Sequence, residues 1–261
     1  DASELFSQII LDIDQPSIDG INTWIVSRAT SKSVKVAISG LGGDELFAGY
    51  EHFKWLAKDS ISSLNSYPQI VSIVKKIHSI RPNYITENIL FKIAGPAQRL
   101  AMLRRIVGDY ESSKVLKPKF KLSFEEHLHN HQEQFLRKDA DKVQQTSYAE
   151  MRGYLQSTLL RDGDVMSMAH GLEVRPMLLD HPLIEFIYAL PENFKIDELQ
   201  NKQLFIKATS KYLPSLIKNR QKMGFELPFS NWMAGDLRNQ FIDLLNSENA
   251  KDVFLPSYLK S

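Results

Sequence analysis

The sequence predicts an α/β protein that is predominantly α-helical. It has little strand, and this strand lies near residues 34–38. The β-branched, apolar run VKVAI at 34–38 is typical of a buried parallel strand. Amphipathic spacing just before this run predicts a helix, and after Tyr50 almost every apolar pattern repeats at helical spacing. A helix followed by a strand is half of a βαβ unit, so we expect the partner strands before Asp1.

The elements before this strand are short. Residues 3–13 are apolar on one side and form either a helix or a strand. Ser17 follows a polar break and is a candidate helix N-cap. The spacing after Ser17 predicts an amphipathic helix that ends near Ser31.

The remainder of the chain is predicted to be helical. Gly95-Pro96 interrupts one helical run, and residues 109–120 are predicted to be a polar connector that carries several lysines. The predicted helices cover 67–80, 87–107, 124–136, 143–170, 182–190, 202–213 and 236–245.

A glycine turn follows the strand and is the strongest candidate for function. Ser39-Gly40-Leu41-Gly42-Gly43 places three glycines in five residues, which lets the backbone turn sharply and bring its N–H groups close to an anion. Asp44 and Glu45 come next and begin a helix. This order indicates a corner that binds phosphate and Mg²⁺. An ordinary turn between a strand and a helix is the alternative.

For three other clusters of polar residues, a structural role competes with a functional one. The histidines in 127–131 could bind a metal, but a solvated helix explains them better because no third ligand matches. The cluster in 173–181 is predicted to be a buried structural ion network. Arg220 and Lys222 form a basic loop that is either solvated or a phosphate contact.

Composition limits the class of protein. The chain has 261 residues, 43% hydrophobic and 24% charged, with a formal net charge of +1, which is typical of a globular protein with a sizeable core. The near-neutral charge argues against a nucleic-acid surface, and no apolar run approaches the roughly 20 residues of a membrane span. The absence of cysteine excludes disulfides and thiol nucleophiles and fits a cytoplasmic protein.

Four sequence blocks carry a family resemblance. They are DQPSIDGINTWIVSRA at 14–29, VAISGLGGDELFAGY at 36–50, YLQSTLLRDGDVMSMAHGLEVR at 154–175 with LLDHPLIEF after it, and LPSLIKNRQKMGFELPFSNW at 213–232. In this order they resemble the synthetase domain of the glutamine-dependent asparagine synthetases. Residues 60–142 carry no signature of that family.

The resemblance implies a Rossmann-like ATP pyrophosphatase fold, of the adenine nucleotide alpha hydrolase type. The chain would form the C-terminal portion of the domain, with residues 1–58 ending the nucleotide-binding core and residues 59–261 mainly helical. The family's glutaminase domain and its SGGxDS loop do not occur in the sequence. The chain therefore resembles a fragment of a longer enzyme.

The resemblance also implies an activity. Members of the family adenylate the aspartate side chain with ATP and Mg²⁺, release pyrophosphate, and let glutamine-derived ammonia displace AMP. The implied partners are aspartate, ATP and ammonia, without nucleic acid or membrane, and a homodimer is left open. The implied roles are catalytic for Lys202, metal binding for Asp44, and nucleotide binding for Ser39, Gly40, Gly42, Gly43, Glu45 and Lys222.

Several departures from the family leave the substrate open. Leu41 stands where many members carry glutamate, polar residues at 156–158 replace an expected aspartate, Val165 replaces a basic residue, and Pro176-Met177 replaces the usual Val-Pro. The alternatives are a relative that amidates or cyclises another carboxylate, such as a sugar acid, a β-amino acid or a peptide, and a helical module without catalysis.

We predict that residues 1–261 alone lack synthetase activity, because the SGGxDS loop should supply much of the phosphate cradle. Pyrophosphate release with ATP and aspartate measures this. Robust turnover by the isolated chain would show that the turn at 39–44 serves as the main phosphate loop.

Overall fold

A computed structural model describes residues 2–57, 68–94, 96–120, 139–197, 201–218, 227–235 and 237–259. The chain divides into two compact units, the first Asp1–Trp55 with Arg137–Asn231 and the second Leu56–Leu136 with Trp232–Ser261. The chain leaves the first unit after Trp55 and returns to it at Arg137. The division at residue 58 between a nucleotide-binding core and a helical part stays a prediction.

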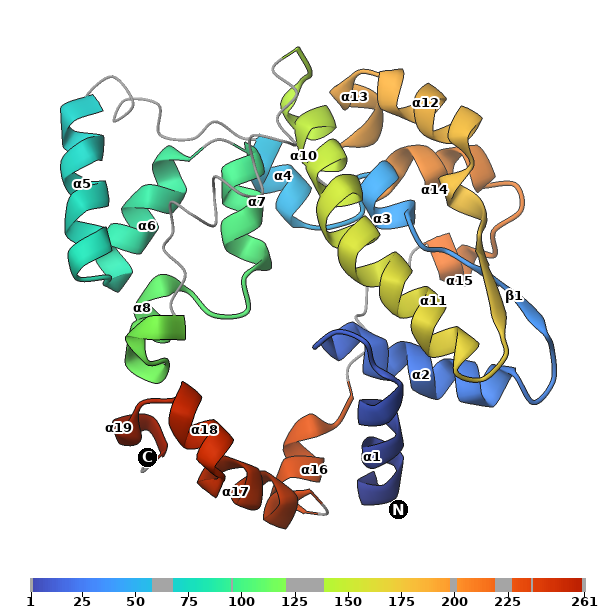
Figure 1. Cartoon of the computed structure of the whole chain (residues 1–261). Coiled ribbons are helices and arrows are strands. Elements are labelled where there is room, and N and C mark those ends of the chain that lie inside the picture. The colour runs from blue at the N-terminus through green and yellow to red at the C-terminus, as the bar shows by residue number, and fades with distance from the viewer. Residues whose placement is uncertain are drawn as a thin grey trace. The chain divides into compact units, whose positions relative to one another are not determined.

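The first unit is mainly helical (Figure 1). Its elements in chain order are α1 (Ala2–Asp12), α2 (Ile18–Thr30), β1 (Val36–Ser39), α3 (Gly43–Leu46), α10 (Lys142–Glu150), η4 (Met151–Leu159), α11 (Leu160–Met168), β2 (Glu173–Pro176), η5 (Met177–Leu179), α12 (His181–Ala189), α13 (Glu192–Lys195), α14 (Gln203–Thr209) and α15 (Ser215–Lys218). Helices α4 (His52–Ala57) and α16 (Phe229–Ala234) cross from one unit to the other along the chain.

The described residues contain one sheet, made of two parallel strands. Val36 of β1 pairs with Glu173 of β2, and Ser39 pairs with Pro176. The strand predicted at 34–38 is confirmed, although it begins two residues later and ends one residue later than predicted. Its predicted burial is wrong, because Val36 and Ile38 are 42% and 76% exposed.

The second strand lies in the segment that sequence analysis assigned to a buried ion network. Glu173 and Arg175 pair with each other at 2.8 Å, but both side chains are more than half exposed. Asp180 and His181 are exposed as well. The prediction of burial is wrong because these charged residues alternate along an exposed strand and then begin a surface helix, where water solvates the charges.

The predicted helix after Ser17 is confirmed as α2. The Ser17 hydroxyl accepts the backbone N–H of Gly20 and donates to the buried carboxylate of Asp162 on α11. Asp162 also accepts from Gln15 at 2.7 Å, so a single carboxylate on α11 fixes the start of α2. This contact explains why a polar break in the sequence becomes an ordered junction.

The core of this part of the unit forms around Trp24, which is 1% exposed. It packs with Ile9, Ile21 and Met166, and its indole N–H donates to Asp12 at 2.7 Å. Met166 brings α11 into the same cluster as α1 and α2. The predicted long helix over 143–170 is confirmed as α10, η4 and α11, which Figure 1 shows as one continuous rod.

The regular elements of the second unit, among its described residues, are helices, apart from an isolated bridge between Leu116 and Phe254. They are α5 (Pro68–Ile80), α6 (Tyr84–Ile93), α7 (Pro96–Arg104), α8 (Asp109–Val115), η2 (Pro118–Phe120), α17 (Arg238–Asn246), α18 (Glu248–Val253) and α19 (Pro256–Leu259). The break predicted at Gly95-Pro96 is confirmed by the boundary between α6 and α7. Leu90, Ile93 and Met102 form a buried cluster in this unit.

The segment 109–120, predicted to be a connector, is largely helical instead. The Glu87 carboxylate on α6 accepts hydrogen bonds from the backbone N–H groups of Asp109 and Tyr110. These N–H groups lie at the start of α8, where a helix has no carbonyl oxygens of its own to accept them. Arg105 joins Glu87 and Asp109 through contacts of 2.9 Å. The carboxylate that caps α8 comes from another helix, so the sequence around α8 carries no signal for its start.

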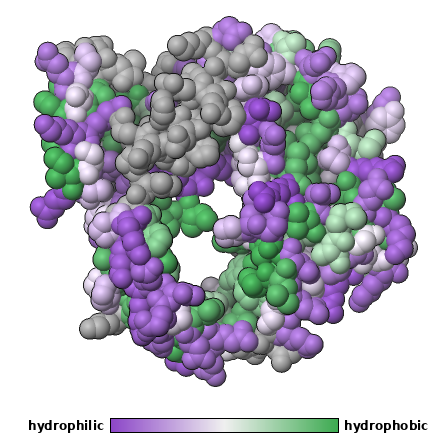
Figure 2. All heavy atoms as spheres, viewed as in Figure 1, coloured by the Kyte–Doolittle hydropathy of each residue, from purple (hydrophilic) through white to green (hydrophobic). Residues whose placement is uncertain are grey.

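Apolar and charged residues are mixed over the face of the molecule in Figure 2. None of the helices in the described ranges is both long enough and apolar enough to cross a membrane.

Lys195, at the end of α13, is a buried cation that should lower the stability of the first unit near neutral pH. Its side chain is 1% exposed, and its Nζ donates to the carbonyl oxygen of Tyr188 at 3.0 Å. Burial lowers the pKa of Lys195 to about 8, against the opposing charge of Asp141. The ordinary value is 10.5, so the folded state releases this proton before the unfolded state does as pH rises.

We therefore expect Lys195→Met to raise the free energy of unfolding at pH 7 by on the order of 1–3 kcal/mol. The gain should shrink between pH 8 and 10.5, because the wild-type lysine becomes neutral in the folded state over that range. Chemical denaturation at pH 7 and 9.5 measures it, with Lys207→Met, on an exposed position of α14, as the control. An equal change in the free energy of unfolding at both pH values would contradict this account.

Candidate active site

The glycine turn between β1 and α3 depends on two residues without side chains, Gly42 and Gly43. Gly42 has φ +85°, and a Cβ there would lie 2.1 Å from Cδ2 of Leu179. A Cβ on Gly43 would lie 2.8 Å from Cδ1 of Leu178. The turn is therefore packed tightly against the segment that follows β2, and glycine is needed for both conformation and space.

The turn places Asp44 against Lys202, which comes from a distant part of the chain. Lys202 Nζ lies 3.1 Å from Asp44 Oδ2, and both side chains remain partly exposed. Helix α14 is fixed by Phe205, whose ring packs on Phe47 with centroids 5.2 Å apart. Lys202 has φ +53°, an uncommon conformation for a residue with a side chain, held here by this packing.

Gly49 makes the approach of Asp44 and Lys202 possible. A Cβ on Gly49 would lie 2.1 Å from Asp44 Oδ1 and 2.4 Å from Lys202 Cε. Its backbone N–H donates to the Asp44 carbonyl oxygen at 2.8 Å. Asp44 and Lys202 thus occupy the space that a side chain at position 49 would need.

Glu45 points into the protein rather than toward Lys202. It is 1% exposed and accepts a hydrogen bond of 2.7 Å from the Tyr50 hydroxyl. Burial raises the pKa of Glu45, and the bond from Tyr50 partly opposes the rise. Its carbonyl oxygen accepts from Ser147 at 2.7 Å, which connects the turn to α10.

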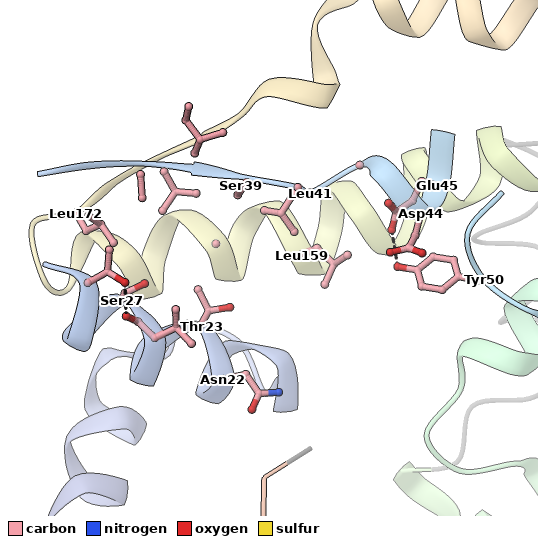
Figure 3. A pocket seen from close by; sticks show the side chains of 18 residues that line it. Asn22, Thr23, Ser27, Ser39, Leu41, Asp44, Glu45, Tyr50, Leu159 and Leu172 are labelled. Atoms are coloured by element: carbon pink, nitrogen blue, oxygen red, sulfur yellow. Dashed lines mark hydrogen bonds between the residues drawn. The ribbon is translucent and has the colours of Figure 1, made fainter. Parts of the chain in front are cut away.

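The glycine turn lines a cavity of about 600 Å³ within the first unit. In Figure 3, Asp44, Glu45 and Tyr50 lie at one end, and Asn22, Thr23 and Ser27 of α2 lie at the other. Leu41 and Leu159 lie between these ends. Ser39 lines the cavity as well, and its hydroxyl oxygen is buried without a hydrogen-bond partner in the described ranges.

The orphaned Ser39 hydroxyl and the open glycine turn fit a ligand rich in oxygen acceptors. Within the described residues, no group of three histidine, aspartate or glutamate side chains could hold a metal by itself. Magnesium on a nucleotide is usually bound by one or two carboxylates together with phosphate oxygens, so a single carboxylate such as Asp44 fits that arrangement.

Most of the site residues predicted from sequence meet in this region. Asp44 contacts Lys202, and the cavity lining includes Ser39, Gly40, Gly42 and Glu45. Gly43 begins α3 directly beside them. Lys222, Arg220 and the histidines in 127–131 lie outside the described residues.

Sequence reasoning missed the contribution of α2. Thr23, Ser27 and Thr30 line the cavity. Their spacing of four and three residues places them on one face of the helix, so the signal was present as a polar stripe. It was overlooked because the apolar positions of the same helix suffice to predict its packing.

Comparisons with known proteins agree with the sequence resemblance. The family described as asparagine synthase matches residues 1–260. Asparagine synthetase [glutamine-hydrolyzing] 1 of Bacillus subtilis is 25% identical over 258 residues, which is 95% of this chain and 39% of the relative. A putative asparagine synthetase of Mycobacterium tuberculosis is 26% identical, covering 88% of this chain and 36% of the relative.

A relative with a different name also matches. Amidase chry2 of Gibberella zeae is 20% identical over 93% of this chain and 39% of the relative. The chain therefore spans about two fifths of the length of the curated relatives it matches. No solved structure matches it significantly.

We expect Gly49→Ala to destabilise the protein by about 1–3 kcal/mol, because the added methyl group must displace Asp44 or Lys202 from their contact. Gly153→Ala is the matched control, since a Cβ at Gly153 meets no atom within 4 Å. Denaturant unfolding of the two variants measures the difference. Equal stability of both variants would mean that the close approach at Gly49 relaxes without cost.

Proposed function

The chain belongs to the asparagine synthase family, and on that premise we propose that it supplies the phosphate-binding and magnesium-binding corner of an ATP-dependent amidoligase. The observation that carries this proposal is the contact of 3.1 Å between Asp44 and Lys202 at the end of a glycine turn. An acid for the metal and a cation for the phosphate oxygens are the two groups that nucleotide activation of a carboxylate requires.

The proposed reaction has two steps. A carboxylate oxygen attacks the α-phosphorus of ATP, a new P–O bond forms, and the bond to the bridging oxygen breaks as pyrophosphate leaves. Ammonia then attacks the acyl carbon, the C–O bond to AMP breaks, and the nitrogen gives up a proton. Aspartate is the acid and glutamine the ammonia source that the names of the bacterial relatives suggest.

Each residue of the corner has a role in this proposal. The backbone of Gly40, Gly42 and Gly43 lets a phosphate approach closely, and the Ser39 hydroxyl donates to one of its oxygens. Lys202 faces the charge that develops on the departing pyrophosphate. Asp44 would hold Mg²⁺, which when bound neutralises phosphate charge.

Glu45 and Lys222 complete the assignment. Glu45 has a supporting role in this proposal. Its carboxylate accepts a hydrogen bond from Tyr50 and its carbonyl oxygen accepts one from Ser147, and these bonds fix the first turn of α3. Lys222 is proposed as a further phosphate contact on the sequence resemblance alone. A Rossmann-like nucleotide-binding core remains the proposed setting, and the parallel pairing of β1 and β2 is compatible with it.

Replacement of Lys202 tests this function in the full-length protein that contains the chain. We expect Lys202→Ala to lower ATP–pyrophosphate exchange by at least about 100-fold, because a preorganised charge is lost from the transition state. Lys202→Arg should rescue poorly, since a planar guanidinium does not reproduce a compact ammonium.

The control is Lys207→Ala, an exposed lysine on the same helix, which should keep wild-type exchange. Melting curves of all variants separate a catalytic loss from a folding defect. Normal exchange by a folded Lys202→Ala protein would remove Lys202 from the reaction, whereas absence of exchange in the wild-type protein would favour the alternative of a helical module without catalysis.

A further inference from the structure

Helix α5 of the second unit presents four isoleucines, the isoleucine row, that remain exposed to solvent. They recur at spacings of three, four and three residues, so they lie along one face of the helix. Their exposed fractions are 46% for Ile70, 58% for Ile73, 49% for Ile77 and 76% for Ile80. Single exposed apolar residues are common, but a continuous apolar row marks a surface that contacts another molecule.

The inner face of α5 fixes the direction in which the isoleucine row points. Val71 and Val74 pack on the buried apolar cluster of the second unit, and α5 lies beside α6 (Figure 1). His78 is 3% exposed, and its two ring nitrogens contact Thr86 Oγ1 at 2.8 Å and Asp109 Oδ2 at 3.0 Å. Rotation of α5 to bury the isoleucines would break both contacts. The row therefore faces outward because the contacts of the inner face hold it there.

The isoleucine row lies in positively charged surroundings. Lys76 and Arg81 flank it on opposite sides, as the 3.6-residue turn of a helix requires. The backbone N–H of Arg81 donates to the Ile77 carbonyl oxygen at 2.9 Å, so helical hydrogen bonding extends to this residue. Lys75 adds a third cation, and the sequence from 68 to 86 contains no acidic residue. The surface is therefore complementary to a negatively charged partner.

A helix is the partner that this geometry fits. Alternating spacings of three and four residues in a single row form the seam of a helix pair, whereas a helix that lies on a membrane presents a broader apolar face. A second copy of α5 would bring basic flanks against basic flanks, which is repulsive. A helix with acidic residues beside its own apolar seam avoids this repulsion and matches both the row and its flanks.

We propose that α5 is a docking surface for an amphipathic helix whose apolar seam is flanked by acidic residues. The isoleucine row buries against that seam, and Lys76 and Arg81 pair with the acids. This inference goes beyond the proposed function, because the described residues that line the cavity include none from α5. It concerns the segment 60–142, which carries no sequence signature of the asparagine synthase family.

A pair of synthetic peptides tests the proposal on the full-length protein that contains the chain. Each peptide is a helix of about three heptads with leucine along its seam, and the flanking positions are glutamate in one peptide and lysine in the other. Like charges keep each peptide from pairing with itself. Fluorescence anisotropy should show that the glutamate peptide binds at least about tenfold more tightly than the lysine peptide. Added salt should reduce this difference.

Matched variants locate the binding surface. Ile77→Ser should weaken binding of the glutamate peptide by about tenfold or more, because one buried isoleucine is lost. Ile106→Ser makes the same change at a residue that is 85% exposed and lies outside α5, and it should leave binding unchanged. Lys76→Glu combined with Arg81→Glu should reverse the preference between the two peptides. Melting curves followed by circular dichroism establish that each variant is folded.

Two further measurements identify other occupants of the surface. Binding to vesicles of phosphatidylserine and phosphatidylcholine that requires Ile77, without peptide binding, would overturn the proposal in favour of a lipid surface. A dimer in analytical ultracentrifugation that Ile77→Ser dissociates would overturn it in favour of a second copy of the chain. Equal binding of the two peptides by the wild-type protein, or binding of neither, would overturn it as well.

Discussion

The candidate site depends on one steric constraint, the close approach of glycine backbone to neighbouring side chains after β1. Gly42, Gly43 and Gly49 each lie where a Cβ would enter a neighbouring side chain. Because Gly42 and Gly43 have no side chains, the turn packs directly on Leu178 and Leu179. Because Gly49 has none, Asp44 can contact Lys202. The position of α14, and with it the lysine, follows from a backbone that leaves room for it.

Hydrogen bonds of Glu45 form a second set of contacts that fixes this turn. Glu45 is buried, bonded to Tyr50, and connected through its carbonyl oxygen to Ser147 on α10. The rod formed by α10, η4 and α11 continues from there to Asp162, which fixes the start of α2. The two ends of the cavity are therefore attached to the same long helix, which sets the distance between them.

Local signals were sufficient for the parts of the structure that sequence predicted. Ser17 caps α2, the β-branched run near 34–38 forms β1, and the glycines turn the chain, because each depends on neighbouring residues. The prediction failed where the deciding partner is remote. β2 was overlooked because its strand partner lies far back in the chain, and α8 because its cap is Glu87. For the site, Ser39 and Asp44 were local inferences, whereas their contact with Lys202 required the fold.

The ion pair between Asp44 and Lys202 has a consequence for how ligands enter. While the two groups face each other, each compensates the other's charge in a partly desolvated place. An anion that binds Lys202 must compete with Asp44, and a cation that binds Asp44 must compete with Lys202. A ligand that brings both charges together can replace both sides of the contact at once, so the ion pair is compatible with exchange for a complex of a cation and an anion.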